Sequence, residues 1–480
     1  MPLIAVFLVS ALTALLVTPA VVRFAHARGV FGVSRESAHH GGRVPRLGGI
    51  AVCIAMTGGV AAAALLAPAV PPIGAEDPAR FYGGLLLAGW ILFLAGLVDD
   101  LHHLPPHTKF LAQLAAALVA YAFGFRIETV GFGDATMALG WVSLPLTVLW
   151  MVGVTNAFNL IDGLDGLATG IGLVALATTF LVSLLLGNLE VAAVCAALGG
   201  ALVGFLRYNL RPARIFLGDS GSLFVGFMLA VLSVHGSTKS TTAVLAIIPM
   251  LVLALPILDT TLSIVRRWLR GTPVWDADER HLHHRLLAVG LTHVRAVVVL
   301  YVLAIGLAVI AMVLAFAPPP VVAATSIGGA VASTAVLLYG IKRLGYHEFV
   351  EAGVVVTSGL ARVRQSIRDL IHARDVAAVI ARAETEEHLR AILADNASAL
   401  GFLDIVFCAE SAATGGRPEL PPQHSARAWK LEFPVPARSA DPHDPWVLRI
   451  WCDPREGARL AGGGRVVRVL ADAVAAWLQA

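Results

Sequence analysis

Aspartate residues that could hold a metal ion or move a proton lie at the ends of long apolar stretches of this chain. The first pair, Asp99 and Asp100, closes such a stretch in the sequence Gly-Leu-Val-Asp-Asp. Adjacent carboxylates repel each other unless a cation or a proton relieves them, and this repulsion raises one pKa. The pair therefore suits a metal ion or a general base.

A second polar segment places four oxygen-bearing side chains at a regular interval. Asn156, Asn159, Asp162 and Asp165 recur at every third residue. On an α-helix or a 3₁₀ turn this spacing directs them toward one side. Carboxylate oxygens suit Mg²⁺, and amides suit sugar hydroxyls or the edge of a base. A capped helix end would explain one of these residues, but not four at this spacing.

A third segment, Phe216-Leu-Gly-Asp-Ser-Gly-Ser, begins another apolar stretch with a glycine-bearing turn. The turn predicts a helix whose free N–H groups face a phosphate, with Asp219 placed to hold the ion that bridges phosphates. The alternative is that Asp219 or Ser220 simply caps the helix. The two interpretations are compatible.

Three histidines, His281, His283 and His284, form a fourth candidate in a polar loop. Imidazoles near phosphates favour substrate binding or proton handling. A zinc site is the rival, but no cysteine lies nearby and this spacing is not a standard zinc pattern.

Asp259 lies inside a further apolar stretch, seven residues before Arg266 and thus on the same face of a helix. A structural ion pair and a direct role in substrate binding are both compatible with this position.

The composition indicates that membrane surrounds most of these elements. Hydrophobic residues make up 57% of the 480 residues and charged ones only 14%, whereas soluble domains carry about a quarter charged residues. The net charge of +3 is too small to indicate nucleic acid as a partner. The four cysteines show no disulfide or metal spacing.

A membrane-spanning helix needs about 20 mostly apolar residues, and the chain contains about eleven such stretches. They lie near 3–22, 47–68, 81–98, 109–126, 141–158, 167–187, 190–206, 222–236, 242–264, 295–316 and 321–341. Lys and Arg gather in one set of loops, and the opposite set holds only Arg80, Arg126 and Lys239. This asymmetry predicts an N-terminus outside, a C-terminus inside, and all the aspartates above on the cytoplasmic side.

The composition changes after Lys342, where charged residues become as frequent as in a soluble domain. Thr385 can cap a helix, 429–435 and 446–451 alternate as strands do, and 465–478 is amphipathic. The expected fold is therefore an all-α polytopic membrane bundle over 1–345. A small cytoplasmic α/β domain of unknown role follows over 346–480.

The four motifs, in this order, closely resemble the polyprenyl-phosphate N-acetylhexosamine-1-phosphate transferase superfamily (glycosyltransferase family 4). The loop Val44-Pro-Arg-Leu-Gly-Gly and Arg343-Leu-Gly-Tyr-His-Glu-Phe resemble that family as well. The resemblance covers about residues 1–350. The sequence His281-Leu-His-His-Arg-Leu is similar to the branch that uses UDP-N-acetylglucosamine.

The resemblance implies an enzyme of the bacterial inner membrane that transfers N-acetylglucosamine 1-phosphate, or a related sugar phosphate, from a UDP-sugar to undecaprenyl phosphate. This reaction would initiate the synthesis of a cell-envelope polysaccharide or glycan. The implied cofactor is Mg²⁺, with Mn²⁺ as a substitute, and a homodimer is compatible with the sequence. No nucleic-acid partner is expected.

The resemblance also implies roles for individual residues. Asp219 would be the principal metal ligand, and Asp99 and Asp100 would face the lipid phosphate and the metal. The remaining site residues would shape the nucleotide and diphosphate site or contact the donor: Arg46, Asn156, Asn159, Asp162, Asp165, His281, His283 and His284.

Two other classes of protein remain as rivals. A transporter also carries acids within its membrane segments, but those acids gather at the midplane, whereas these are expected at one face. A membrane sensor would work through its C-terminal domain, which shows no kinase, cysteine or metal motif.

Overall fold

The structure is a computed structural model that describes most of the chain. The described residues are 2–31, 44–66, 77–132, 135–238, 250–270, 281–316, 325, 360–400, 402–409, 429–435, 446–452 and 457–478. The chain forms two compact units. One comprises 1–263 and 277–335, and the other comprises 264–276 and 336–480.

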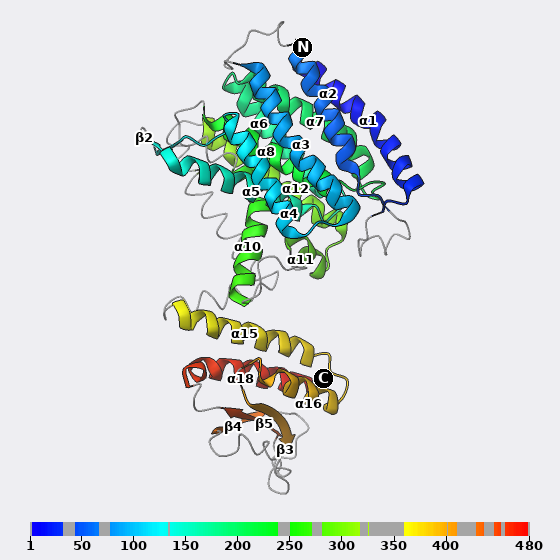
Figure 1. Ribbon diagram of the computed structural model, residues 1–480. Helices are drawn as coiled ribbons and strands as arrows, with labels where there is room; N and C mark the ends of the chain where they lie inside the picture. Colours follow the sequence, from blue (N-terminus) through cyan, green and yellow to red (C-terminus); the bar gives the residue numbers. More distant parts are fainter. Residues whose placement is uncertain are drawn as a thin grey trace. The chain divides into compact units, whose positions relative to one another are not determined.

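The first unit is a helical bundle (Figure 1). Its helices are α1 (Pro2–Arg28), α2 (Gly48–Leu66), α3 (Pro78–His102), α4 (Pro106–Ala122), α5 (Ser143–Ile161), α6 (Leu167–Leu185), α7 (Leu189–Asn209), α8 (Gly218–Thr238), α10 (Ala254–Arg270, which continues into the second unit), α11 (Leu282–Ala288) and α12 (His293–Phe316). Within the described residues, eight helices are long and apolar enough to cross a membrane.

The prediction of a polytopic helical bundle is therefore confirmed, while the count of eleven spans stays a prediction. The stretch expected near 109–126 corresponds to α4, which has only 17 residues. The stretch near 321–341 lies almost wholly outside the described residues, as does part of 242–264.

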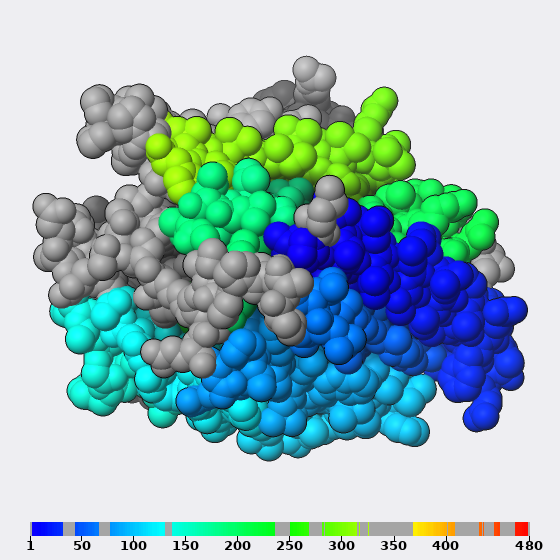
Figure 2. Space-filling model, turned by 90° about the horizontal axis from the view of Figure 1, so that it is seen from above, coloured from blue at the N-terminus to red at the C-terminus, as the bar shows by residue number. Residues whose placement is uncertain are grey.

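Helix α8 lies at the centre of the bundle, and nearly all of it is buried. It packs against α2, α3, α5, α6 and α7. Figure 2 shows α1, in blue, and α12, in yellow-green, on the outer surface of the same unit. A buried apolar helix surrounded by others in this way has little freedom to shift, because protein interiors are close-packed.

Glycines allow the N-terminus of α8 to approach its neighbours closely. A Cβ atom on Gly96 of α3 would lie 2.5 Å from the Asp219 carbonyl oxygen. One on Gly49 of α2 would lie 2.3 Å from the backbone nitrogen of Gly221. Only glycine fits where backbones come this close.

A short antiparallel hairpin connects α4 to α5. Its strands are β1 (Thr129–Phe132) and β2 (Ala135–Ala138), followed by the 3₁₀ turn η3 (Gly140–Val142). Because the hairpin precedes α5 and Asp162 follows it, the hairpin and the acidic segment lie at opposite ends of that helix.

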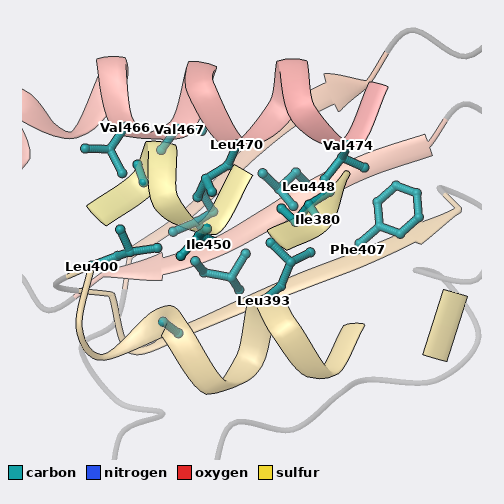
Figure 3. Close-up of a cluster of buried hydrophobic side chains, with 14 of the residues drawn as sticks. Ile380, Leu393, Leu400, Phe407, Leu448, Ile450, Val466, Val467, Leu470 and Val474 are labelled. Carbon is teal, nitrogen blue, oxygen red and sulfur yellow. The ribbon is translucent and has the colours of Figure 1, made fainter. Parts of the chain in front are cut away.

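The second unit packs helices on a three-stranded antiparallel sheet. It contains α15 (Leu360–Ile380), α16 (Glu386–Ala397), β3 (Asp404–Ala409), β4 (Trp429–Val435), β5 (Trp446–Cys452) and α18 (Gly457–Trp477), and the strand order is β3-β5-β4. Alternate residues of the strands, such as Phe407, Leu448 and Ile450, share one core with Ile380 and Leu470 of the helices (Figure 3).

Several local features of this unit follow from its sequence. The Thr385 hydroxyl accepts the N–H of His388 and caps α16, as the sequence predicted. Both predicted strands are present at 429–435 and 446–452. The closing helix begins earlier than predicted, at Gly457.

The close approach of α3 to α8 predicts a specific sensitivity to one methyl group. Gly96→Ala should destabilise the protein by about 1–3 kcal/mol, because the added atom meets backbone that cannot move aside. Gly83→Ala on the same helix is the matched control, since nothing lies within 4 Å of its added Cβ. Thermal unfolding in detergent should show a lower Tm for Gly96→Ala only. Equal Tm values for the two variants would contradict this packing.

Candidate active site

Five aspartates from three separate stretches of chain converge at one end of the bundle. Asp99 and Asp100 lie in the last turn of α3, Asp162 and Asp165 follow α5, and Asp219 lies in the first turn of α8. The charges of Asp100, Asp165 and Asp219 all act on the Asp162 carboxyl group. The structure thus brings together the acids that the sequence singled out.

Asp100 caps helix α8 across the bundle. Its Oδ1 accepts the backbone N–H of Asp219 at 2.8 Å. Its Oδ2 accepts the backbone N–H of Ser220 at 3.0 Å and the Ser220 hydroxyl at 2.6 Å. A carboxylate at this position satisfies two amides that the helix leaves unpaired and interacts favourably with the helix dipole.

This contact corrects the expectation that the first N–H groups of α8 are free to bind phosphate. Two of them, those of Asp219 and Ser220, already donate to Asp100. The cap also does not come from Asp219 or Ser220 themselves, because the carboxylate that forms it lies on another helix. Both oxygens of Asp100 are engaged by protein, so its expected role as a metal ligand competes with these contacts.

Asp99 and Asp219 are joined by a lysine. The Lys109 Nζ atom donates to Asp99 Oδ2 at 3.2 Å and to Asp219 Oδ2 at 2.9 Å. Asp99 Oδ1 also accepts the backbone N–H of Leu104 at 2.7 Å. Lys109 was not predicted as a site residue, because a single basic residue near a span end is usually a topological signal.

The two asparagines of the regular segment make different contacts. Asn156 exchanges two hydrogen bonds with Gln113 of α4, of 3.0 and 2.6 Å, and also donates to the Val152 carbonyl. Its amide therefore links α4 to α5 and is engaged within the bundle. Asn159 donates to the Ser222 hydroxyl at 3.0 Å and interacts with the Asp219 carboxylate.

The two aspartates of that segment also differ. Asp165 Oδ2 accepts the backbone N–H of Ala213 at 3.2 Å and so holds the loop that follows α7. The Asp162 carboxylate makes no hydrogen bond to any residue that the structure describes. Burial raises the pKa of Asp162 to about 7, and the charges of Asp219, Asp100 and Asp165 act in the same direction, opposed by Arg46.

Arg46 lies in a loop that packs against the start of α8. Backbone hydrogen bonds join Phe216 N–H to the Pro45 carbonyl at 2.9 Å and Gly48 N–H to the Phe216 carbonyl at 3.0 Å. The Arg46 carbonyl also lies close to Gly218, which adopts a positive φ of 73° that favours glycine. Arg46 therefore lies beside the acids, as its predicted role requires.

The histidine segment is anchored by a buried carboxylate. Asp259 Oδ2 lies 3.1 Å from Nδ1 of His281, and Asp259 Oδ1 accepts the Leu282 N–H at 2.8 Å. Asp259 and His281 are both buried. Asp259 therefore holds His281 and the start of α11. The ion pair expected between Asp259 and Arg266 stays a prediction. His284 is exposed, and the side chain of His283 lies outside the described residues.

A tyrosine that the sequence did not single out supports the aspartate loop. The Tyr301 hydroxyl of α12 donates to the Gly166 carbonyl at 2.6 Å. Gly166 has a positive φ of 76°, and a Cβ on Gly170 would collide with Tyr301. Gln113 and Tyr301 carried no sequence signal, because each is a single polar residue in an apolar stretch. Ser222 closes the Phe216–Ser222 motif, but its contact with Asn159 was not predicted.

The carboxylate oxygens of this site suit Mg²⁺ that is bound partly by substrate, and they do not form a complete set of ligands by themselves. Within the described part of the chain, no group of three or more His, Cys, Asp or Glu side chains is arranged to hold a metal ion. Mg²⁺ in phosphate-transfer sites usually takes one or two carboxylates, and substrate phosphates and water complete its shell. Asp219 and the hydrogen-bond-free Asp162 could supply those carboxylates.

Comparisons with known proteins agree with this site. Residues 82–237, which carry all five acids, match glycosyl transferase family 4. A protein of Bacillus subtilis (strain 168) described as a probable undecaprenyl-phosphate N-acetylglucosaminyl 1-phosphate transferase is 38% identical over 314 residues, which cover 65% of this chain and 85% of that protein.

Two further relatives broaden the comparison. A decaprenyl-phosphate N-acetylglucosaminephosphotransferase of Mycolicibacterium smegmatis is 36% identical over 302 residues, covering 57% of this chain and 72% of that protein. A phospho-N-acetylmuramoyl-pentapeptide-transferase of Limosilactobacillus fermentum is 42% identical over 128 residues, covering 27% of this chain and 40% of that protein.

The hydrogen bonds of Asp100 predict that its loss frays the start of α8. Asp100→Ala should lower stability by about 1–2 kcal/mol, the usual cost of losing a cap. Amide hydrogen exchange at Asp219 and Ser220 should become faster, because their acceptor is gone.

Asp77→Ala is the control, since Asp77 caps α3 through the Arg80 N–H. It should leave exchange at Asp219 and Ser220 unchanged. Unchanged exchange in Asp100→Ala would contradict the capping role.

Proposed function

This chain belongs to glycosyl transferase family 4, and from that premise we propose that it transfers N-acetylglucosamine 1-phosphate from a UDP-sugar to undecaprenyl phosphate. The acidic cluster at one end of the helical bundle carries the proposal. Two anionic substrates can meet there only if positive charge is supplied, and the carboxylates of the cluster would supply ligands for a cation.

Different residues of the site would bind the metal ion, the donor and the phosphates. Asp219 and Asp162 would hold Mg²⁺, which when bound neutralises the donor diphosphate and stabilises the departing UMP. Asn159 lies beside Asp219 and suits the donor. Arg46 and Lys109 supply positive charge to the phosphates. We assign the site to the cytoplasmic face of the bacterial inner membrane, where the basic loops are predicted and where UDP-sugars are made.

The reaction needs positioning and charge neutralisation more than covalent chemistry by the protein. An oxygen of the lipid phosphate forms a bond to the β-phosphorus of the donor. The bond from that phosphorus to the UMP oxygen breaks, and UMP leaves with the electron pair. The product is a lipid-linked sugar diphosphate. Residues that hold the two phosphates in line therefore contribute most of the rate.

We favour direct attack over a phosphorylated aspartate. Both oxygens of Asp100 accept hydrogen bonds from α8, and both oxygens of Asp99 are engaged by Leu104 and Lys109. Attack on phosphorus by either carboxylate would compete with these contacts. Incubation with labelled donor alone is the test, and a stable phosphorylated protein would support the two-step route.

Loss of Asp219 should abolish most turnover. Asp219→Ala should reduce Mg²⁺-dependent UMP release by on the order of 10²-fold or more, as for the loss of a central electrostatic group. Glu128→Gln is the control, because Glu128 is exposed and lies beside the hairpin at the other end of α5. Near-normal Mg²⁺-dependent turnover by folded Asp219→Ala would remove the metal assignment.

The donor is tested by a panel of UDP-GlcNAc, UDP-GalNAc and UDP-MurNAc-pentapeptide. We expect undecaprenyl phosphate and UDP-GlcNAc to give the highest kcat/KM, measured by UMP release and by mass spectrometry of the lipid product. Turnover with UDP-MurNAc-pentapeptide alone would assign the chain to the peptidoglycan reaction instead. Product with none of the donors, from a folded preparation, would contradict the proposed reaction.

A further inference from the structure

Lys109 lies between two carboxylates that belong to different helices. Its Nζ atom is 3.2 Å from Asp99 Oδ2 of α3 and 2.9 Å from Asp219 Oδ2 of α8. The lysine itself lies in the first turns of α4. Three helices therefore meet at one ammonium group, beside the carboxylate that the proposed function gives to the metal ion.

The position of this lysine in its helix is unfavourable by itself. Helix α4 begins at Pro106, and neither an acidic side chain nor a side-chain cap lies at its first turn. The N-terminal end of a helix carries partial positive charge, which disfavours a cation there. The two carboxylates offset that cost, and they also attract the ammonium group away from water.

Lys109 contacts the same carboxylate that the proposed function gives to a divalent cation. Two cations within a few ångströms of one carboxylate repel each other strongly where water is partly excluded. The Lys109, Asp99 and Asp219 side chains are 28%, 12% and 27% exposed, so the screening by water is incomplete. The ammonium group and the metal ion would therefore weaken each other's binding to the Asp219 carboxylate.

We propose that Lys109 is a built-in competitor of the divalent cation at Asp219. The ammonium group holds Asp99 and Asp219 together when the cation is not bound there. When the cation binds Asp219, Lys109 retains only Asp99, and its freed N–H groups turn to the nearest phosphate. Metal binding and phosphate binding by Lys109 are thereby coupled. This inference rests on the proposed function only in taking Asp219 as the metal ligand.

A purely structural role for Lys109 leads to a different expected result. If Lys109 served only to hold the helices together, its removal would loosen the site and weaken or leave unchanged the affinity for a cation. If Lys109 competes with the cation, its removal should strengthen cation binding. The direction of the change in Kd therefore distinguishes the two roles.

The first test measures Mn²⁺ binding to the full-length protein in detergent, without donor or acceptor, from the electron paramagnetic resonance signal of free Mn²⁺. Lys109→Met should bind Mn²⁺ about tenfold more tightly than the wild type. Lys109→Arg keeps the charge and should bind within about twofold of the wild type. Adding Asp219→Asn to Lys109→Met should abolish the gain, which locates the ion.

An equal or larger Kd for folded Lys109→Met, including binding by neither protein, would overturn the proposal. Folding is judged by size-exclusion chromatography and Tm.

A second measurement uses the wild-type chain, so it does not depend on a variant that folds. An amine-acylating reagent is applied with and without Mn²⁺, and labelling of Lys109 is read by mass spectrometry relative to Lys430 of the second unit. Mn²⁺ should raise the labelling of Lys109, because one of its carboxylate partners is taken. Unchanged or lower relative labelling at a saturating Mn²⁺ concentration would overturn the competition.

These readouts are independent of turnover. A protein that shows the predicted Mn²⁺ effects but makes no lipid product would contradict the proposed function and leave the competition intact. If the protein makes the product but Lys109→Met shows no gain in Mn²⁺ affinity, the proposed function stands and the competition is contradicted.

Discussion

The contact between the Asp100 carboxylate and the first amides of α8 is the interaction on which the site depends. It joins the end of α3 to the beginning of the most buried helix of the bundle. The glycines at 49 and 96 allow this approach, because any larger residue would meet backbone. Since Asp219 is the second residue of α8, its carboxylate is placed by the same contact that caps the helix.

The remaining acids differ in how much freedom the fold leaves them. Asp99 and Asp165 are held by backbone amides of neighbouring loops, whereas Asp162 has no hydrogen-bond partner among the described residues. Carboxylates this close together repel one another, so their ionised forms favour the binding of a cation and disfavour the approach of phosphate. In the proposed reaction, the cation would therefore have to arrive with, or before, the anionic substrates.

The histidine segment contains both a buried and an exposed histidine within one motif. His281 is buried and held by Asp259, so it orients the start of α11, whereas His284 is exposed. The sequence could not separate them, because the three histidines are identical in type and nearly adjacent. The partner that separates them lies 22 residues earlier in the chain.

The sequence by itself determined the membrane-embedded helical class, the acidic residues and the family. Each of these depends on local composition or on short motifs. It also indicated two strands and the Thr385 cap of the second unit, but β3 was not predicted. The tertiary structure alone decided which acids are engaged and which is free of hydrogen bonds. Asp100 and Ser220 are 120 residues apart, and Lys109 and Asp219 are 110 apart. Contacts at such separations arise from how the helices pack, so they cannot be predicted from residue types and local spacing.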